Sequence, residues 1–277
     1  MAVPKVTGSA SATASPATGL PERFTAEDGV LYRRLAKTTL DTARRKKVTL
    51  TVAINDKPLD IAVSCRGDRN APVPQIKVGN RMLPGARIGP CVKNMQLIAL
   101  PLPKEPGRVT VLFDATTHGT SCVRSRKDGP CEPTVPKNGV WTLGVYEWTP
   151  PDSPIEPPAV KAFPPVKGYR ALEVKTGVWP DDSVATVRVR GGQVIGTDQL
   201  CTGSLARRLK VTVLLNGRAT GVGGDCGVWE KGSYPMAMAG TKIPPGKDAE
   251  LTIRFSMAGP VGNRPVRWSA GFWEETK

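Results

Sequence analysis

The sequence has few aromatic residues, almost no histidine and no long apolar run. His118 is the only histidine among 277 residues, and aromatic residues make up 5% of the chain. A single histidine argues against His-rich metal sites, proton relays and most hydrolase triads. No segment approaches the roughly 18 apolar residues of a membrane helix. No apolar segment near Met1 resembles a signal peptide. We therefore expect no membrane-spanning helix.

The two halves of the chain resemble each other. Six landmarks recur in the same order, among them a Tyr-Arg pair, two cysteines and a final Trp-to-Glu strand. The matched positions are Tyr32 and Tyr169, Cys65 and Cys201, Asn80 and Asn216, Cys91 and Cys226, Phe113 and Phe255, and the final strands Trp141 to Glu147 and Trp268 to Glu274. An internal repeat of this length predicts two homologous domains, residues 31–149 and 168–277.

The segments outside these repeats have a biased composition. Residues 150–167 contain seven prolines, which predict an extended, semi-rigid linker. Residues 1–30 begin with a Gly-, Ser- and Ala-rich stretch that lacks the apolar area needed for order, so we predict an N-terminal tail there.

Both repeats alternate apolar and polar residues with period two, which is typical of half-buried strands. The clearest such segments are 48–54, 75–78, 109–113, 186–189, 210–214 and 251–255. Turn dipeptides separate them, for example Asn216-Gly217. Residues 31–40 would also suit a helix, but the matching residues of the second repeat alternate, so we predict a strand in both. The pattern predicts an all-β chain of two antiparallel β-sandwiches, jelly-roll or Ig-like.

The cysteines repeat with the domains. We predict one disulfide in each domain, Cys65–Cys91 and Cys201–Cys226, because each pair recurs at the same place. Cys122 and Cys131 belong to an insertion of the first domain and would close a third loop. Buried thiols or a zinc site are the alternatives, and zinc is disfavoured because no Cys-x-x-Cys spacing exists. Disulfides predict an extracytoplasmic protein, which would make this sequence a mature or truncated form.

No catalytic motif stands out. A triad of Ser121, His118 and Asp114 is imaginable, but Ser121 lies three residues from the histidine and no Gly-x-Ser-x-Gly elbow is present. Glu147 and Glu274 fall one in each domain, whereas a glycosidase needs two carboxylates across one cleft. We predict a protein without catalytic activity, cofactor or metal, although loop carboxylates leave calcium undecided.

Charge distinguishes the two repeats. Residues 31–150 carry 20 basic and 9 acidic residues, and residues 168–277 carry 15 and 10. Two basic clusters account for much of the difference: Arg44, Arg45, Lys46 and Lys47, and then Arg124, Arg126 and Lys127. The first corresponds to an acidic segment around Asp181 and Asp182 in the second repeat. Such clusters attract polyanions, and the alternative is an ordinary solvated surface. Nucleic acid is the least favoured partner, because aromatic residues are not interleaved with the basic ones.

Aromatic residues also distinguish the repeats. Trp141 and Trp268 match each other and are predicted in the cores. Trp179, Trp229 and Tyr234 lie in turn-like segments without aromatic counterparts in the first repeat. They are candidates for stacking on glycans, and the alternative is that they cap the sandwich or dock against the first domain.

These features predict a binding protein that engages an anionic cell-wall polymer or polysaccharide outside the cytoplasm. A structural component assembled head to tail with itself or another surface protein is the first alternative. An enzyme of unrecognised type, using His118 or the Glu147 region, is the second.

Overall fold

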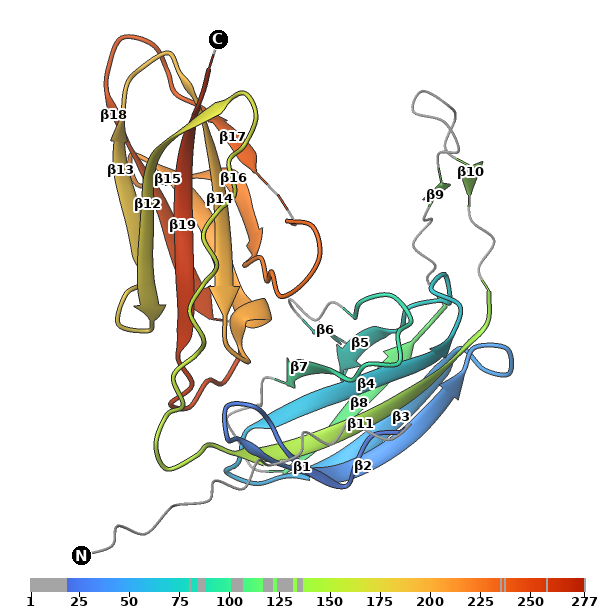
Figure 1. Cartoon of the computed structure of the whole chain (residues 1–277). Coiled ribbons are helices and arrows are strands. Elements are labelled where there is room, and N and C mark those ends of the chain that lie inside the picture. The colour runs from blue at the N-terminus through green and yellow to red at the C-terminus, as the bar shows by residue number, and fades with distance from the viewer. Residues whose placement is uncertain are drawn as a thin grey trace, which may run out of the picture.

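The computed structural model describes residues 19–79, 81–83, 88–100, 107–116, 137–234, 236, 238–257 and 259–276, and the backbone of residues 122–123 and 132–133. The described residues form two antiparallel β-sandwiches in tandem, with one short 3-10 turn, η1 (Ala206–Arg208) (Figure 1). This confirms the predicted all-β class.

Two stacked sheets build the first sandwich. In the described part of the chain, one sheet has the strand order β1 (Arg23–Thr25), β2 (Leu31–Asp41), β11 (Gly139–Thr149), β4 (Leu59–Gly67) and β7 (Gln96–Leu100). The other has the order β3 (Lys47–Ile54), β8 (Gly107–Asp114), β5 (Gln75–Val78) and β6 (Arg81–Met82). A separate ribbon pairs β9 (Cys122–Val123) with β10 (Glu132–Pro133).

The second sandwich repeats this arrangement. Among the described residues, its first sheet has the order β12 (Tyr169–Trp179), β19 (Val266–Glu275), β14 (Val194–Thr202) and β17 (Ala239–Lys242). Its second sheet has the order β13 (Val184–Val189), β18 (Ala249–Met257), β15 (Leu209–Leu215) and β16 (Arg218–Asp225). The segment 31–40, for which local propensity alone would suit a helix, forms most of β2, as the comparison of the repeats predicts.

The strand pairing identifies both sandwiches as jelly rolls. In the first sandwich, β2 pairs with β11, β3 with β8, β4 with β7 and β5 with β6. The same nested pairs recur as β12 with β19, β13 with β18, β14 with β17 and β15 with β16. A long antiparallel hairpin rolled into two sheets is the jelly-roll topology. Of the two sandwich types predicted from sequence, the structure therefore has this one.

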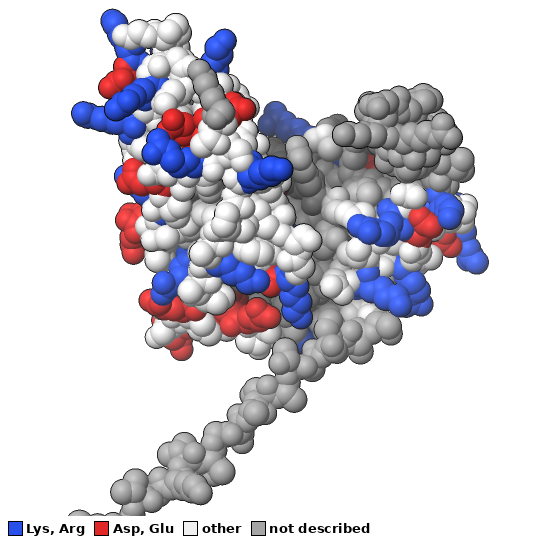
Figure 2. All heavy atoms as spheres, turned by 45° about the horizontal axis from the view of Figure 1, so that its top comes forward, with Lys and Arg blue, Asp and Glu red and all other residues white. Residues whose placement is uncertain are grey.

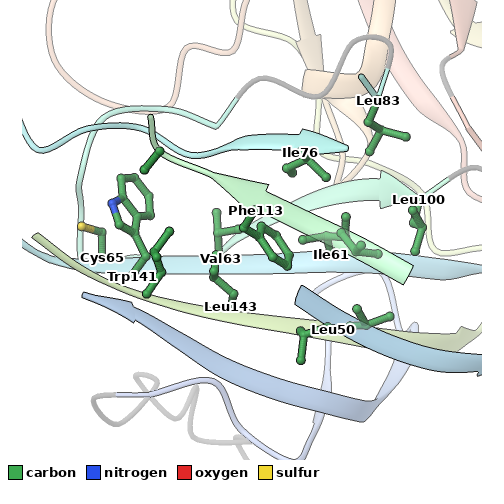
Figure 3. Packing of buried hydrophobic residues seen from close by; sticks show 14 of the residues in the cluster. Leu50, Ile61, Val63, Cys65, Ile76, Leu83, Leu100, Phe113, Trp141 and Leu143 are labelled. Carbon is green, nitrogen blue, oxygen red and sulfur yellow. The ribbon is translucent and has the colours of Figure 1, made fainter. Parts of the chain in front are cut away.

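Each core contains one of the two matched tryptophans. Trp141 and Trp268 are 1% and 2% exposed, and both indole nitrogens donate to backbone carbonyls, those of Pro72 and Asp182. Figure 3 shows Trp141 beside Cys65 and Phe113 between the sheets of the first sandwich. Burying the indole rings while satisfying their N–H groups explains why the repeats share these positions.

Disulfides link Cys65 with Cys91 and Cys201 with Cys226, as predicted. The Cα atoms are 4.9 and 5.9 Å apart, and both bridges lie against their cores. Cys131 and the Cys122 side chain lie outside the described residues, so the third bridge stays a prediction.

The end of the predicted N-terminal tail is folded. Residues 23–25 form β1, which pairs with β2, and Leu20 and Val30 are 3% and 0% exposed. Leu20 packs against Gly144, where a larger residue would collide with it. The prediction of a tail over residues 1–30 is therefore wrong for residues 19–30, which pack on the first sandwich. Apolar residues of this segment cover the outer face of the first sheet. The low-complexity composition of the preceding residues gave no indication of this packing.

The proline-rich linker runs along the second sandwich (Figure 1). Thr202 donates a hydrogen bond to the Pro158 carbonyl, and Arg267 pairs with Glu156. Further along, the ring of Phe163 lies 5.0 Å from that of Trp273, centroid to centroid. The linker is extended as predicted, but its position is set by these contacts.

A buried polar network joins the two sandwiches. Arg208 on η1 donates two hydrogen bonds to Asp60 on β4, at 3.1 and 2.5 Å, and Asp60 is completely buried. Tyr32 donates to the same carboxylate at 3.0 Å. Arg264, in the loop before β19, bonds to Asp28 at 2.5 Å and to the Tyr32 hydroxyl at 3.2 Å. Burial raises the pKa of Tyr32 well above its ordinary value, so this hydroxyl stays protonated. These contacts hold the strands of the two sandwiches at a steep angle (Figure 1).

Candidate binding surfaces

The first predicted basic cluster occupies the exposed turn between β2 and β3 and the first residue of β3, Lys47. Asp41 shapes the turn: its carbonyl accepts the backbone N–H groups of Arg44 and Arg45 at 3.1 and 2.9 Å, and its carboxylate accepts that of Ala43 at 3.0 Å. The four side chains from Arg44 to Lys47 are all exposed. A fixed backbone therefore presents four consecutive cations to solvent.

Lys47 is joined to a fifth cation that sequence reasoning missed. Lys47 and Lys77 lie 3.5 and 3.1 Å from the same carboxylate oxygen of Asp114. Asp114 also accepts hydrogen bonds from the Thr116 N–H and hydroxyl groups, at 3.0 and 2.5 Å. The alternating pattern of residues 75–78 indicated that Lys77 points outward. Only the sheet order, in which β5 lies beside β8, brings Lys77 close to Asp114. We call Arg44, Arg45, Lys46, Lys47 and Lys77 the basic surface.

The second predicted basic cluster cannot be placed relative to this surface. Arg124, Arg126 and Lys127 lie outside the described residues, as do His118 and Ser121. Figure 2 shows basic groups with few acidic ones on the visible face of the first sandwich, and a mixture of both signs on the second. The visible faces of the two sandwiches thus differ in charge in the same direction as the two repeats.

Acid is expected to destabilise the first sandwich through Asp114. Hydrogen bonding from the Thr116 hydroxyl, reinforced by Lys77 and Lys47, holds the pKa of the Asp114 carboxyl well below its ordinary value of about 4 against the opposing effect of burial. Because the pKa is lower in the folded state, this stabilisation is fully present above the unfolded-state pKa and is lost as the pH falls through the acidic range. Urea unfolding between pH 7 and pH 2.5 measures the loss.

Asp114→Asn is the matched variant for that experiment. It should be less stable than the parent at pH 7, and its stability should depend less steeply on pH below about 5. An Asp114→Asn variant that reproduces the parent's acid profile would contradict the assignment.

Asp182, in the acidic segment that corresponds to the basic turn, accepts hydrogen bonds within the second sandwich. The Asp182 carboxylate accepts the Val178 N–H at 3.3 Å, and its carbonyl accepts the indole N–H of Trp268 at 2.8 Å. The peptide bond between Trp179 and Pro180 is cis. Trp179 itself is half-buried and packs against the core of the second sandwich.

The other two candidate aromatic residues, Trp229 and Tyr234, lie next to each other. The rings of Trp229 and Tyr234 are 5.2 Å apart, and the Tyr234 hydroxyl donates to Asp198 at 2.5 Å. Burial and the Asp198 carboxylate raise the pKa of Tyr234, so the hydroxyl remains a donor. The linker contacts both rings: the Lys161 ammonium lies 4.8 Å above the Trp229 ring, and Phe163 lies 6.2 Å from Tyr234. The pair therefore packs against the linker, while docking against the first domain and glycan stacking both stay predictions.

The matched glutamates form matched ion pairs. Glu147 and Glu274 each lie 2.7 Å from an arginine directly opposite on the neighbouring strand, Arg33 and Arg170. Arg33 lowers the pKa of Glu147 by hydrogen bonding to its carboxylate. The same cross-strand ion pair is present in both sandwiches. Its role in stabilising the sheet explains why both repeats have a glutamate at this position.

Within the described ranges, no group of three or more His, Cys, Asp or Glu side chains is arranged to hold a metal ion. None of the helical structure in that part of the chain is long and apolar enough to cross a membrane.

Comparisons with known proteins leave the family open. No protein-family model and no curated protein matches the chain. Among solved structures, HutD from Pseudomonas fluorescens SBW25 aligns with 92% of this chain and 94% of its own, at 10% sequence identity and a TM-score of 0.16. A TM-score this low supports no inference about fold or function.

Proposed function

We propose that this protein is a non-catalytic, extracytoplasmic binding protein that engages an anionic cell-surface polymer through the basic surface of its first sandwich. The observation that carries the proposal is the exposed turn of four consecutive cations, whose backbone is held by Asp41. Lys77, on β5, adds a fifth positive charge beside this turn, because it shares the Asp114 carboxylate with Lys47.

Electrostatics supports a polymer over a small ligand. Exposed cations in a row attract a chain of negative charges by releasing its counterions, and they place weak demands on ligand geometry. Asp41 and Asp114 offset part of the positive charge, but Arg45 and Lys46 bond to backbone carbonyls and have no acidic partner within 4.0 Å among the described residues. The surface therefore keeps an excess of positive charge.

The two disulfides support an oxidising compartment, in which cell-surface polymers are encountered. Head-to-tail assembly and an unrecognised enzymatic activity stay alternative hypotheses.

Neutralising the turn is expected to weaken polymer binding at least ten-fold at low salt. The variant Arg44→Gln/Arg45→Gln/Lys46→Gln/Lys47→Gln removes four charges and leaves Asp41 to form the turn. Titration of the full chain with poly(glycerol phosphate) gives the affinity at several salt concentrations. By analogy with nucleic acids, each lost contact lowers the slope of log K against log salt by about 0.7 to 0.9, so four contacts lower it by about 3.

The matched control replaces exposed cations of the second sandwich, as Arg188→Gln/Arg190→Gln/Lys231→Gln/Lys247→Gln, and should bind as the parent does. Cosedimentation with bacterial cell walls, with and without their anionic polymers, checks the natural source. Equal binding by the turn variant and the parent, or binding that does not depend on salt, would refute the proposal.

A further inference from the structure

One edge of the second sandwich is an uninterrupted strand. In the described part of the chain, β13 is the last strand of its sheet and pairs with β18 on one side only, over six consecutive residues without a register shift. It lies on the side of the second sandwich that is turned away from the first (Figure 1). The outer side of β13 is therefore open to another strand.

The other described edge strands of this sandwich have features that discourage further pairing. A register shift interrupts the pairing of β12 with β19 and of β16 with β15, and β17 has only four residues. Natural proteins protect exposed edges with short strands, bulges, lysine or proline. β13 contains no bulge, lysine or proline, so it lacks this protection.

The backbone of β13 directs hydrogen-bonding groups outward. The Ser183 carbonyl accepts a hydrogen bond from β18 at 2.8 Å, so Ser183 and every second residue after it bond to that strand. The N–H and C=O groups of Val184, Thr186 and Arg188 therefore point away from the sheet. The hydroxyls of Thr186 and Thr252 lie 3.0 Å apart, as expected where paired residues do not bond through their backbones.

The charges at the two ends of β13 are opposite. Asp181 and Asp182 precede the strand, Arg188 and Arg190 lie at its end, and all four side chains are exposed. Neither arginine has an acidic partner within 4.0 Å among the described residues, although Glu250 of β18 lies opposite Arg188. Two copies of this strand in antiparallel orientation would place acid beside base at both ends.

The matching edge of the first sandwich lacks this charge pattern. Aligning β3 with β13 through the matched phenylalanines of β8 and β18 places Lys47 at the position of Asp182 and Asn55 at that of Arg190. Two antiparallel copies of β3 would bring Lys47 beside a neutral side chain, and lysine on an edge strand discourages pairing. The complementary pattern is thus particular to the second sandwich.

We propose that two copies of this protein associate through β13, antiparallel and about a two-fold axis at Thr186. The two four-stranded sheets then form one continuous sheet, and the same surface of each copy contacts the other. No residue is shared with the basic surface, so this inference goes beyond the proposed function.

The free backbone groups and the charges define the register. With Thr186 on the axis, Val184 lies opposite Arg188 of the second copy, and every outward N–H and C=O group of β13 gains a partner. The same register places Asp182 opposite Arg190 of the second copy. Val184, which is 52% exposed, is then covered by the aliphatic part of the opposite arginine. Ala185, which faces the core, stays on the core side in both copies.

Sedimentation equilibrium of the full chain tests the proposal. One strand pair buries little surface, so we expect a weak dimer with a dissociation constant on the order of 100 µM. Thr186→Pro removes an outward N–H without removing a bond to β18, and should weaken the dimer about ten-fold or more. The matched control Thr51→Pro makes the same change at the corresponding position of β3 and should leave the dimer unchanged. Both variants keep the basic surface, so dimerisation and polymer binding can be tested separately.

Amide hydrogen exchange locates the interface. The N–H groups of Val184, Thr186 and Arg188 should exchange more slowly above the dissociation constant than below it, because they become hydrogen-bonded only in the dimer. The N–H of Thr51 should exchange at the same rate in both conditions.

Charge reversal gives a test that does not depend on the proline variant. Asp181→Lys/Asp182→Lys and Arg188→Glu/Arg190→Glu should each be monomeric, because like charges then meet at both ends of the strand pair. Mixing the two variants should restore a dimer, since the lysines of one copy face the glutamates of the other. If Thr186→Pro does not fold, this mixing experiment decides.

Three results would overturn the proposal. These are a parent chain that stays monomeric up to about 1 mM, roughly ten times the expected dissociation constant, a dimer that survives in folded Thr186→Pro, and reversed variants that do not pair when mixed. A dimer that survives Thr186→Pro but is lost when residues 44–47 are neutralised would favour head-to-tail assembly instead.

Discussion

Asp60→Ala is expected to lower the free energy of unfolding by about 3–5 kcal/mol. Asp60 is completely buried and holds the Arg208 side chain, itself 10% exposed, through two hydrogen bonds. Removing the carboxylate leaves a buried guanidinium and the Tyr32 hydroxyl without their acceptor. The large effect comes from this uncompensated charge, since an intact buried ion pair itself adds little net stability.

Chemical unfolding followed by tryptophan fluorescence measures the loss. Because Asp60 and Arg208 belong to different sandwiches, the variant should also unfold less cooperatively, with the two sandwiches separating into two transitions. Small-angle X-ray scattering should show a larger radius of gyration as their fixed angle is lost.

A double-mutant cycle and a surface control sharpen the test. Asp60→Ala/Arg208→Ala should be less destabilised than the sum of the single variants, because it leaves no buried charge. Glu156→Gln breaks the Glu156–Arg267 pair, in which the glutamate is 81% exposed, and should cost less than about 1 kcal/mol. An Asp60→Ala loss as small as that of Glu156→Gln would show that water reaches Arg208 and that the network does not hold the sandwiches together.

Cys201→Ala/Cys226→Ala is expected to lower the free energy of unfolding by about 3–4 kcal/mol in the chain-entropy account. The bridge joins residues 25 apart and therefore restricts a long loop of the unfolded chain. It also ties the end of β14 to the segment after β16, where the Cys201 N–H bonds to the Gly227 carbonyl at 2.7 Å. Urea unfolding of the variant and the parent gives the difference.

The first sandwich provides the comparison. Cys65 and Cys91 are 26 residues apart, so their double alanine variant should lose a similar amount. The parent in reductant should lose at least as much as either variant. Losses below about 1 kcal/mol in both variants would contradict the view that the bridges stabilise the fold.

Much of the architecture follows from local pattern and internal repetition. Period-two alternation predicts strands such as 48–54 and 251–255, and the structure has them as the larger parts of β3 and β18. Comparison of the repeats predicted a strand for the ambiguous segment 31–40, and the structure has one. The same comparison predicted two disulfides, although six cysteines can be paired in fifteen ways, and both are present. The choice between jelly roll and Ig-like sandwich needed the strand order, which local pattern does not encode.

The candidate sites were less predictable. The basic turn was evident from consecutive residues 44–47, but Lys77 joins it only because β5 lies beside β8. Trp179 and Trp229 looked alike as unmatched loop aromatics, yet one packs on the core and the other against Lys161 of the linker.

The sequence alone determined many of the strands, the repeat and two of the cysteine pairs, because these depend on side-chain periodicity and on spacing that both copies share. Only the tertiary structure decided which distant side chains meet. Asp60 and Arg208 lie 148 residues apart, and their pairing depends on how two finished sandwiches pack against each other. Packing of that kind follows from the shapes and charges of whole surfaces, which no short stretch of sequence contains.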